Sequence, residues 1–202
     1  MRIIGGSAGG RILKVPKGLS VRPTTDLVRQ AVFNSLAARI AGARVLELFA
    51  GTGALSLECL SRGAENAMCI EISSKHAECL RQNARQTGFE SSRLELRVQE
   101  TFVAIHQLAA AGRQFTLIFA DPPFGEKNIG RRSESFAQRL LDDEVLPQLL
   151  APDGLLVLGH ARRDNLSLPE RWDEKKALKH GDSVFRLLRL PRAMAVEMSQ
   201  AD

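Results

Sequence analysis

The four residues Asp121-Pro122-Pro123-Phe124 directly follow an apolar segment and are of types that could act on an aromatic amine. The nitrogen of such an amine is a poor nucleophile because its lone pair is delocalised into the ring. The Asp121 carboxylate and the backbone carbonyl of Pro122 can accept both amino hydrogens, which favours the pyramidal nitrogen that attacks an electrophile. The two prolines stiffen the turn, and Phe124 offers a flat face for an extruded base. The motif therefore predicts a base-amine site; the alternative is a rigid strand-ending turn with Phe124 in the core.

A second candidate site begins at Glu47 and runs through Phe49, Ala50 and Gly51 to Gly53. Glycine at positions 51 and 53 lets the backbone approach a ligand closely, although a Gly-x-Gly pair is also common in plain tight turns. Glu71 ends the next predicted strand, where a carboxylate can accept two hydrogen bonds from a ribose diol. The glycine turn and the Glu71 carboxylate together predict a nucleoside site. Glu100, after the third strand, is placed to accept from an adenine amino group.

This glycine turn differs from that of nicotinamide-dinucleotide enzymes. Their fingerprint needs a third glycine at position 56, where this chain has Ser56. The shorter signature fits a nucleoside ligand without phosphates.

The elements that must position these residues alternate between strand and helix. A helix is predicted from about residue 23, because Val28, Val32, Leu36 and Ile40 follow at intervals of four before Gly42. The alternation predicts an α/β fold with a mostly parallel sheet covered on both faces. The last two predicted strands are joined by a tight turn and form a hairpin, which requires an antiparallel strand near the C-terminus. The predicted strands are 44–49, 66–72, 94–98, 115–120, 155–158, 172–179 and 183–190, and the later helices are 53–61, 73–86, 100–110 and 134–150.

Positive charge is concentrated at the start of the chain. Residues 1–44 hold eight Lys or Arg against Asp26 alone, a net charge of +7, so the other residues sum to −2. This distribution predicts a polyanionic partner, although a merely solvated basic face is the alternative. We predict a basic hairpin arm over 1–22, one domain over 23–190 and a loose tail over 191–202, within the size range of one domain.

Several classes of protein are disfavoured. No apolar run approaches the roughly 20 residues that span a bilayer, and the start has no secretory pattern, so we expect a cytoplasmic protein without membrane contact. Cys59, Cys69 and Cys79 show no Cys-x-x-Cys spacing and are expected to be core residues, with no metal site. We expect a monomer.

With these motifs in place, the sequence resembles the class I S-adenosylmethionine-dependent methyltransferases that act on base amino groups. Their motif is Asp or Asn, two prolines and an aromatic residue. The opening resembles the RsmD-type 16S rRNA (guanine-N2)-methyltransferases, and so does the segment after the glycine turn. The similarity runs from Met1 to about Leu190 and rests on residues 1–6, 10–11, 22–26, 28–29 and 55–64.

The resemblance implies a Rossmann-like, seven-stranded sheet and methyl transfer to N2 of one guanine in 16S rRNA, presented as RNA, as the small ribosomal subunit or as its assembly intermediate. It implies that the arm takes part in binding RNA or in placing the target base. The base-amine residues are then Asp121, Pro122 and Phe124, with Pro123 and the arginines Arg11, Arg22 and Arg29 as candidate RNA contacts, unless those arginines tie the arm to the body. The S-adenosylmethionine residues are then Glu47, Phe49, Ala50, Gly51, Gly53, Glu71, Ile72 and Glu100.

Three positions stay open. Gly159 stands where the family often has an acid, and Glu47 replaces a commoner aspartate. The pair Arg131-Arg132 could touch phosphate or simply be solvated.

Adenine-N6 methylation of DNA or RNA is the main alternative function, since the Asp121 motif does not distinguish adenine from guanine. A nicotinamide-dependent oxidoreductase and a non-enzymatic RNA-binding protein rank lower.

Overall fold

The computed structural model describes residues 1–16, 26–89, 93–125 and 132–191. The chain divides into two compact units, Met1–Ala104 and Ile105–Asp202, with the division inside helix α5 (Thr101–Ala110). Arg22, Arg131, the predicted start of the first helix and the predicted tail lie outside the described residues. The predicted domain bounds stay a prediction.

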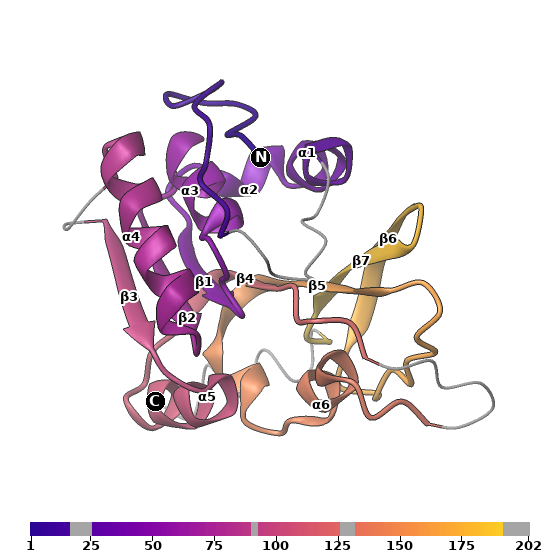
Figure 1. Cartoon of the computed structure of the whole chain (residues 1–202). Helices are drawn as coiled ribbons and strands as arrows, with labels where there is room; N and C mark the ends of the chain where they lie inside the picture. Colours follow the sequence, from indigo (N-terminus) through magenta and orange to yellow (C-terminus); the bar gives the residue numbers. More distant parts are fainter. Residues whose placement is uncertain (17–25, 90–92, 126–131, 192–202) are drawn as a thin grey trace. The chain divides into compact units, whose positions relative to one another are not determined.

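The first unit holds three parallel strands with β2 in the centre, shown in violet to magenta in Figure 1. The strands are β1 (Arg44–Leu48), β2 (Asn66–Glu71) and β3 (Leu94–Val98). The helices α3 (Ala54–Ser61) and α4 (Ser74–Thr87) connect and contact them. Two short helices precede the strands, α1 (Asp26–Ser35) and α2 (Ala37–Ile40).

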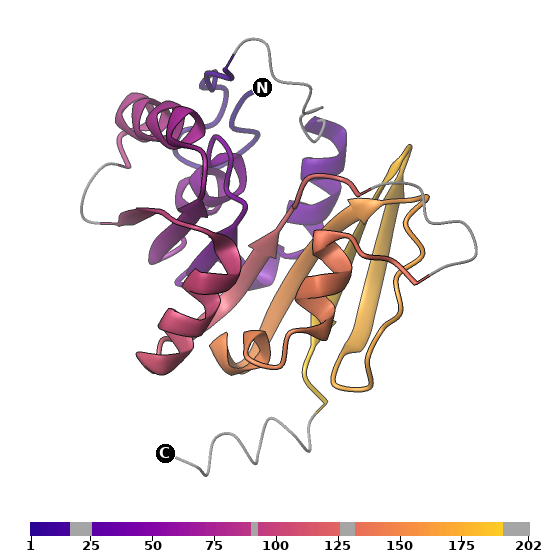
Figure 2. The ribbon, with the colours of Figure 1, turned by 60° about the horizontal axis from the view of Figure 1, so that its bottom comes forward.

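The second unit is a four-stranded part in which β4 (Phe115–Ala120) pairs in parallel with β5 (Leu150–Ala161). Strand β7 (Ser183–Arg189) pairs antiparallel with β5 on one side and with β6 (Asp173–His180) on the other. Figure 2 shows β5, β7 and β6 side by side, with the turn at Gly181 joining the last two. Helix α6 (Phe136–Asp142) and a short 3-10 helix, η1 (Leu146–Leu149), lie between β4 and β5 in the chain.

The strand order is β3-β2-β1-β4-β5-β7-β6. The predicted α/β class, the mostly parallel sheet and the antiparallel strand near the C-terminus are therefore confirmed. Strand β4 is buried along nearly its whole length, as its apolar sequence predicts.

The prediction of one helix over 134–150 is wrong. Helix α6 ends at Asp142, and the Asp143 carboxylate accepts hydrogen bonds from the backbone N–H groups of Val145 and Leu146, both at 2.8 Å. Pro147 has no N–H to donate to a continuing helix. Strand β5 already starts at Leu150, earlier than predicted.

The helix predicted after residue 23 is interrupted at Leu36, between α1 and α2. The four residues that predicted its packed face, Val28, Val32, Leu36 and Ile40, are all buried. The amphipathic pattern therefore identified the buried face correctly, although the helix is broken.

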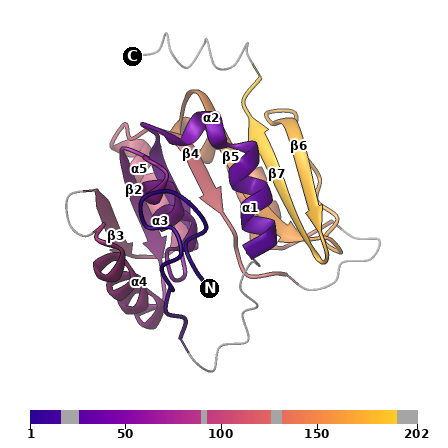
Figure 3. The same ribbon diagram turned by 90° about the horizontal axis from the view of Figure 1, so that it is seen from above.

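The N-terminal arm, defined here as residues 1–16, turns back on itself through an antiparallel bridge between Arg2 and Ile12. Its apolar side chains Ile3 and Leu13 are buried. Figure 3 shows the arm, in indigo, lying over α3 and beside α4. The predicted hairpin is thus a docked part of the first unit.

The three cysteines are free and buried, as expected for core residues. Across the described ranges, no helix has the length and apolar character needed to cross a bilayer.

Candidate cofactor and base-amine sites

The turn after β1 has a backbone conformation that ordinary residues rarely adopt. Three of its residues have positive φ: Phe49 at 56°, Gly51 at 55° and Gly53 at 76°. A Cβ on Gly53 would lie 2.7 Å from Cγ of Leu80 in α4, so the turn packs closely on that helix. A Cβ on Gly51 would meet no described atom within 4 Å, so the space beside this glycine is open. A positive φ at Phe49, which is not glycine, is the kind of backbone strain that concentrates at functional sites.

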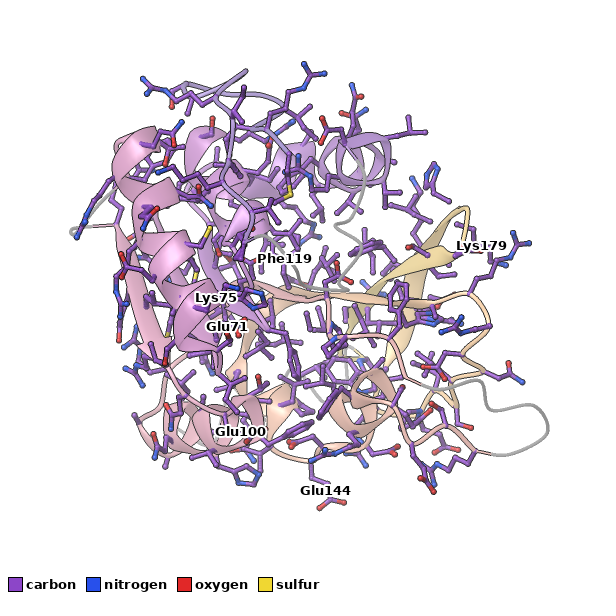
Figure 4. All side chains as sticks on the ribbon, viewed as in Figure 1. Glu71, Lys75, Glu100, Phe119, Glu144 and Lys179 are labelled. Atoms are coloured by element: carbon purple, nitrogen blue, oxygen red, sulfur yellow. The ribbon has the colours of Figure 1, made fainter. Side chains whose placement is uncertain are left out.

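Glu71, at the end of β2, is buried and holds the glycine turn in place. Its Oε2 accepts from the backbone N–H of Gly51 at 2.7 Å, and its Oε1 accepts from that of Ser73 at 2.8 Å. Nδ1 of His76 lies 3.5 Å from Oε1. An ionised carboxylate has about four lone-pair sites, so it can still accept hydrogen bonds from a diol. Figure 4 labels Glu71 at the end of β2 and Lys75 in the first turn of α4.

Glu47 points at the first turn of helix α3. It is 3% exposed, and its carboxylate accepts from the backbone N–H groups of Ser56 at 2.8 Å and Leu55 at 3.4 Å. In dinucleotide enzymes these N-terminal amides bind the pyrophosphate. Here the Glu47 carboxylate accepts from two of these amides, which disfavours a phosphate at the same position.

Exposed apolar groups surround the ends of β2 and β3. Ile72 is 64% exposed directly after Glu71, and Val98, paired with Glu71 across the strands, is 44% exposed. The Phe49 ring packs edge-on against Phe102, with ring centroids 6.5 Å apart. Exposed apolar side chains of this kind suit contact with an adenine ring.

Two other predicted cofactor residues serve the local fold as well. Ala50 is buried and donates its backbone N–H to the Ile70 carbonyl at 2.9 Å. The Glu100 carboxylate accepts from the backbone N–H of Val103 at 2.9 Å, which caps the start of α5.

The base-amine motif lies at the carboxyl end of β4. Asp121 is partly exposed, Pro122 is buried, Pro123 is exposed and the Phe124 side chain is 45% exposed. The alternative with Phe124 in the core is therefore wrong. The Phe124 ring is exposed and therefore available to a ligand.

Gly159, in β5, lies beside the Asp121 carboxylate. A Cβ on Gly159 would come within 2.4 Å of Asp121 Oδ1 and within 3.0 Å of the Phe185 ring. The departure at this position thus has a physical reason, because only a residue without a side chain leaves room for Asp121 in its present place.

The predicted RNA-contact arginines have different surroundings. Arg11 is exposed and donates to the Gln86 carbonyl at 2.7 Å. Arg29 is 1% exposed; it donates to the Arg2 carbonyl and pairs with Asp26 at 2.8 Å. For Arg29 the structure favours the alternative, a tie between arm and body. Arg132 is exposed and pairs with Asp142 at 2.7 Å.

Two important residues were missed from the sequence. Glu58 of α3 is fully buried and accepts from the backbone N–H groups of Ile4 and Gly5, at 2.6 and 2.9 Å, so it holds the arm. Asn83 of α4 is fully buried and contacts the arm at Lys14. The sequence signal that could have identified both residues is a polar side chain on the apolar face of a predicted helix.

The predicted cofactor residues all belong to the first unit and the predicted base-amine residues to the second. Within the described parts of the chain, no cluster of His, Cys, Asp or Glu could hold a metal ion. The strand order, with antiparallel β7 between β5 and β6, and the glycine turn between β1 and α3 define a class I, Rossmann-like methyltransferase fold.

A sequence model of the family described as "Conserved hypothetical protein 95" matches residues 1–189. The chain is 35% identical to ribosomal RNA small subunit methyltransferase D of Escherichia coli (strain K12) over 188 residues, 93% of this chain and 88% of that protein. The chain therefore belongs to this family, the RsmD family.

Solved structures agree with this assignment. The hypothetical protein TTHA0928 of Thermus thermophilus is similar with a TM-score of 0.76 and 30% identity, covering 94% of this chain and 99% of that one. SMU.776, crystallised in complex with SAH, is similar with a TM-score of 0.65 over 82% of this chain and 50% of that one. Its 14% identity shows a shared fold alone.

Proposed function

We propose that this protein transfers a methyl group from S-adenosylmethionine to the exocyclic N2 amine of a guanine in 16S rRNA. Membership of the RsmD family and the similarity to small subunit methyltransferase D support methyl transfer to small-subunit rRNA. The assignment to N2 of guanine rests on the resemblance described above.

The observation that carries the proposal is the Asp121 motif at the end of β4. A partly exposed carboxylate stands beside a buried proline and an exposed phenylalanine. Asp121 and the Pro122 carbonyl accept the two amino hydrogens, and Phe124 stacks on the extruded base. Held in this way, the amine nitrogen presents its lone pair in a fixed direction.

The glycine turn and Glu71 fit S-adenosylmethionine. Bound S-adenosylmethionine supplies an electrophilic methyl group on a sulfonium. Glu71 accepts from the ribose hydroxyls, and the open space beside Gly51 admits the ligand close to the backbone. Because Glu47 occupies the amides at the start of α3, the site disfavours the pyrophosphate of a nicotinamide dinucleotide.

The residues accelerate transfer chiefly by positioning. An amine aligned with the methyl group needs no proton removed before it attacks, since it becomes acidic only once methylated. Asp121 then takes up the proton or passes it to water. Fixing the reacting atoms in line supplies the main part of the rate enhancement.

The arm offers cations that RNA phosphates can bind. Lys14 Nζ donates to the side-chain oxygen of Gln82 at 3.3 Å, and Arg11 donates to the Gln86 carbonyl. Both acceptors are uncharged, so these bonds orient the two side chains without neutralising them. Cations held in this way suit contacts with a phosphate backbone.

The test uses purified protein, radiolabelled S-adenosylmethionine, and small subunits or their RNA from cells lacking the enzyme. Label in N2-methylguanosine after digestion is the expected result, and the Asp121→Ala protein controls for contaminating activity. Label in N6-methyladenine, or label only with DNA, would replace the proposed substrate. No label, despite measurable cofactor binding, would refute nucleic-acid methylation.

A further inference from the structure

Asn83 joins two segments of the first unit that the proposed function treats separately. Its side chain is fully buried on α4. The Oδ1 atom accepts from the backbone N–H of Lys14 at 2.7 Å, and the Nδ2 atom donates to the Lys14 carbonyl at 3.1 Å. The same Nδ2 atom also donates to the Thr52 carbonyl at 3.1 Å. Lys14 belongs to the arm, and Thr52 stands between Gly51 and Gly53.

These bonds use both donors of the amide and fix its orientation. A flipped amide would place its NH2 group against the Lys14 N–H and its oxygen against two carbonyls. Each buried group would then face a group of its own kind, which is costly away from water. The arrangement therefore has one stable form.

The state of the arm must therefore affect the glycine turn. When the arm is docked, Lys14 holds the Asn83 amide in the position from which it reaches Thr52. When the arm leaves, this buried amide loses both of its bonds to Lys14 and keeps those to the Thr52 carbonyl and, at 3.9 Å, to Cys79 Sγ. Its bond to the Thr52 carbonyl is then less well defined, and so is the turn.

We propose that Asn83 is a positioning residue that couples RNA binding at the arm to S-adenosylmethionine binding at the glycine turn. The inference rests on the proposed function. RNA that holds the arm in place tightens cofactor binding, and bound cofactor tightens RNA binding by the same factor, because such coupling is reciprocal.

Gln86 provides a matched control on the same helix. Its side chain donates to the Ile12 carbonyl at 3.0 Å, so it too holds the arm. Its backbone carbonyl accepts from Arg11, which is also an arm residue. Gln86→Ala therefore weakens arm docking alone, whereas Asn83→Ala breaks the connection to the glycine turn.

The experiment measures the dissociation constant of S-adenosylhomocysteine with and without an unmodified 16S rRNA transcript. In the native protein and in Gln86→Ala, RNA is expected to tighten binding about fivefold or more. In Asn83→Ala the ratio is expected to fall close to one. An unchanged ratio in Asn83→Ala, with RNA still bound, would refute the inference and leave the proposed function standing.

A second measurement uses the native protein and decides the matter if Asn83→Ala does not fold. S-adenosylhomocysteine should slow hydrogen exchange at the Lys14 N–H, which donates to Asn83. The N–H groups of Ile4 and Gly5 donate to Glu58 instead, and because they belong to the same docked arm, they should slow together with Lys14. Equal exchange at Lys14 with and without the ligand would overturn the coupling, and failure of the ligand to bind at all would overturn the proposed function together with it.

Discussion

The carboxylate of Asp121 lies against the backbone of Gly159, so close that a methyl group on this glycine would come within 2.4 Å of Oδ1. The two residues follow the ends of a paired stretch, in which Ala120 of β4 stands opposite Leu158 of β5. The backbone of β5 thus forms one wall of the proposed base-amine site.

Gly159→Ala should displace the Asp121 carboxylate and reduce kcat about 100-fold, since a shift of about 1 Å in a reacting group has an effect of this size. The dissociation constant of the cofactor should not change. Adding Gly159→Ala to Asp121→Ala should cause little further loss, because both changes act on the same group. Independent, multiplicative losses in single-turnover assays would contradict this account.

Asp121→Asn and Asp121→Ala should separate charge from hydrogen bonding. Asparagine retains an acceptor oxygen, whereas alanine retains none, so the alanine protein should be the slower of the two. We expect kcat to fall about 100- to 1,000-fold in Asp121→Ala, with cofactor affinity changed at most a fewfold. Isothermal calorimetry provides the affinity. Loss of cofactor binding in Asp121→Ala would mean that Asp121 belongs to the cofactor site and not to the base-amine site.

Glu71→Ala should weaken cofactor binding about 10- to 100-fold, because hydrogen bonds to a charged group are among the stronger ones. It should also lower the free energy of unfolding by about 1–3 kcal/mol, since the amides of Gly51 and Ser73 lose their acceptor. Glu95→Gln on β3 is a suitable control, because Glu95 is exposed and pairs with a neighbour on its own strand, Arg97. Unchanged affinity in Glu71→Ala would remove this residue from the cofactor site.

Arg11 and Arg29 should respond differently to replacement. Arg11→Ala should weaken RNA binding and reduce the slope of log affinity against log salt by about one. Arg29→Ala should instead lower the unfolding free energy by about 2 kcal/mol, because the Arg2 carbonyl loses this donor and Asp26 keeps only the bond from Arg2. Salt titrations and urea unfolding measure the two effects. The same loss of slope in both proteins, with stability intact, would show that Arg29 reaches RNA.

His160, in β5 next to Gly159, should make stability depend on pH. Burial, and then the charge of Arg186, hold the pKa of His160 below its usual value of 6.5. As the pH falls below about 6.5, the unfolded chain binds a proton that the folded protein still rejects, so stability decreases.

Urea unfolding at about pH 7.5, 6.5 and 5.5 tests this dependence on pH. His160→Gln should flatten the decline, whereas His106→Gln, at an exposed position, should not. An equal decline in the His160→Gln and native proteins would exclude His160 as the cause.

The sequence predicted most of the fold because the strands are short apolar segments separated by helices with one apolar face. It failed over 134–150, where Asp143 ends a helix whose apolar pattern continues beyond it. Candidate site residues near Glu71 and Asp121 could be predicted because glycine, acid and proline have few structural uses in those positions. The burial of Arg29 and the role of Asn83 depend on where the arm folds back, which no local pattern contains. Contacts between residues 69 positions apart, such as Lys14 and Asn83, arise only from the tertiary fold.

The docking of the arm also affects how the protein folds during synthesis. Residues 1–16 are synthesised before the groups that hold them, because Glu58 lies 54 positions after Ile4 and Asn83 lies 69 positions after Lys14. The arm therefore docks only after α3 and α4 have been made, and contacts of this range are entropically slow to form. A bulky fusion partner placed before Met1 would slow the docking of the arm.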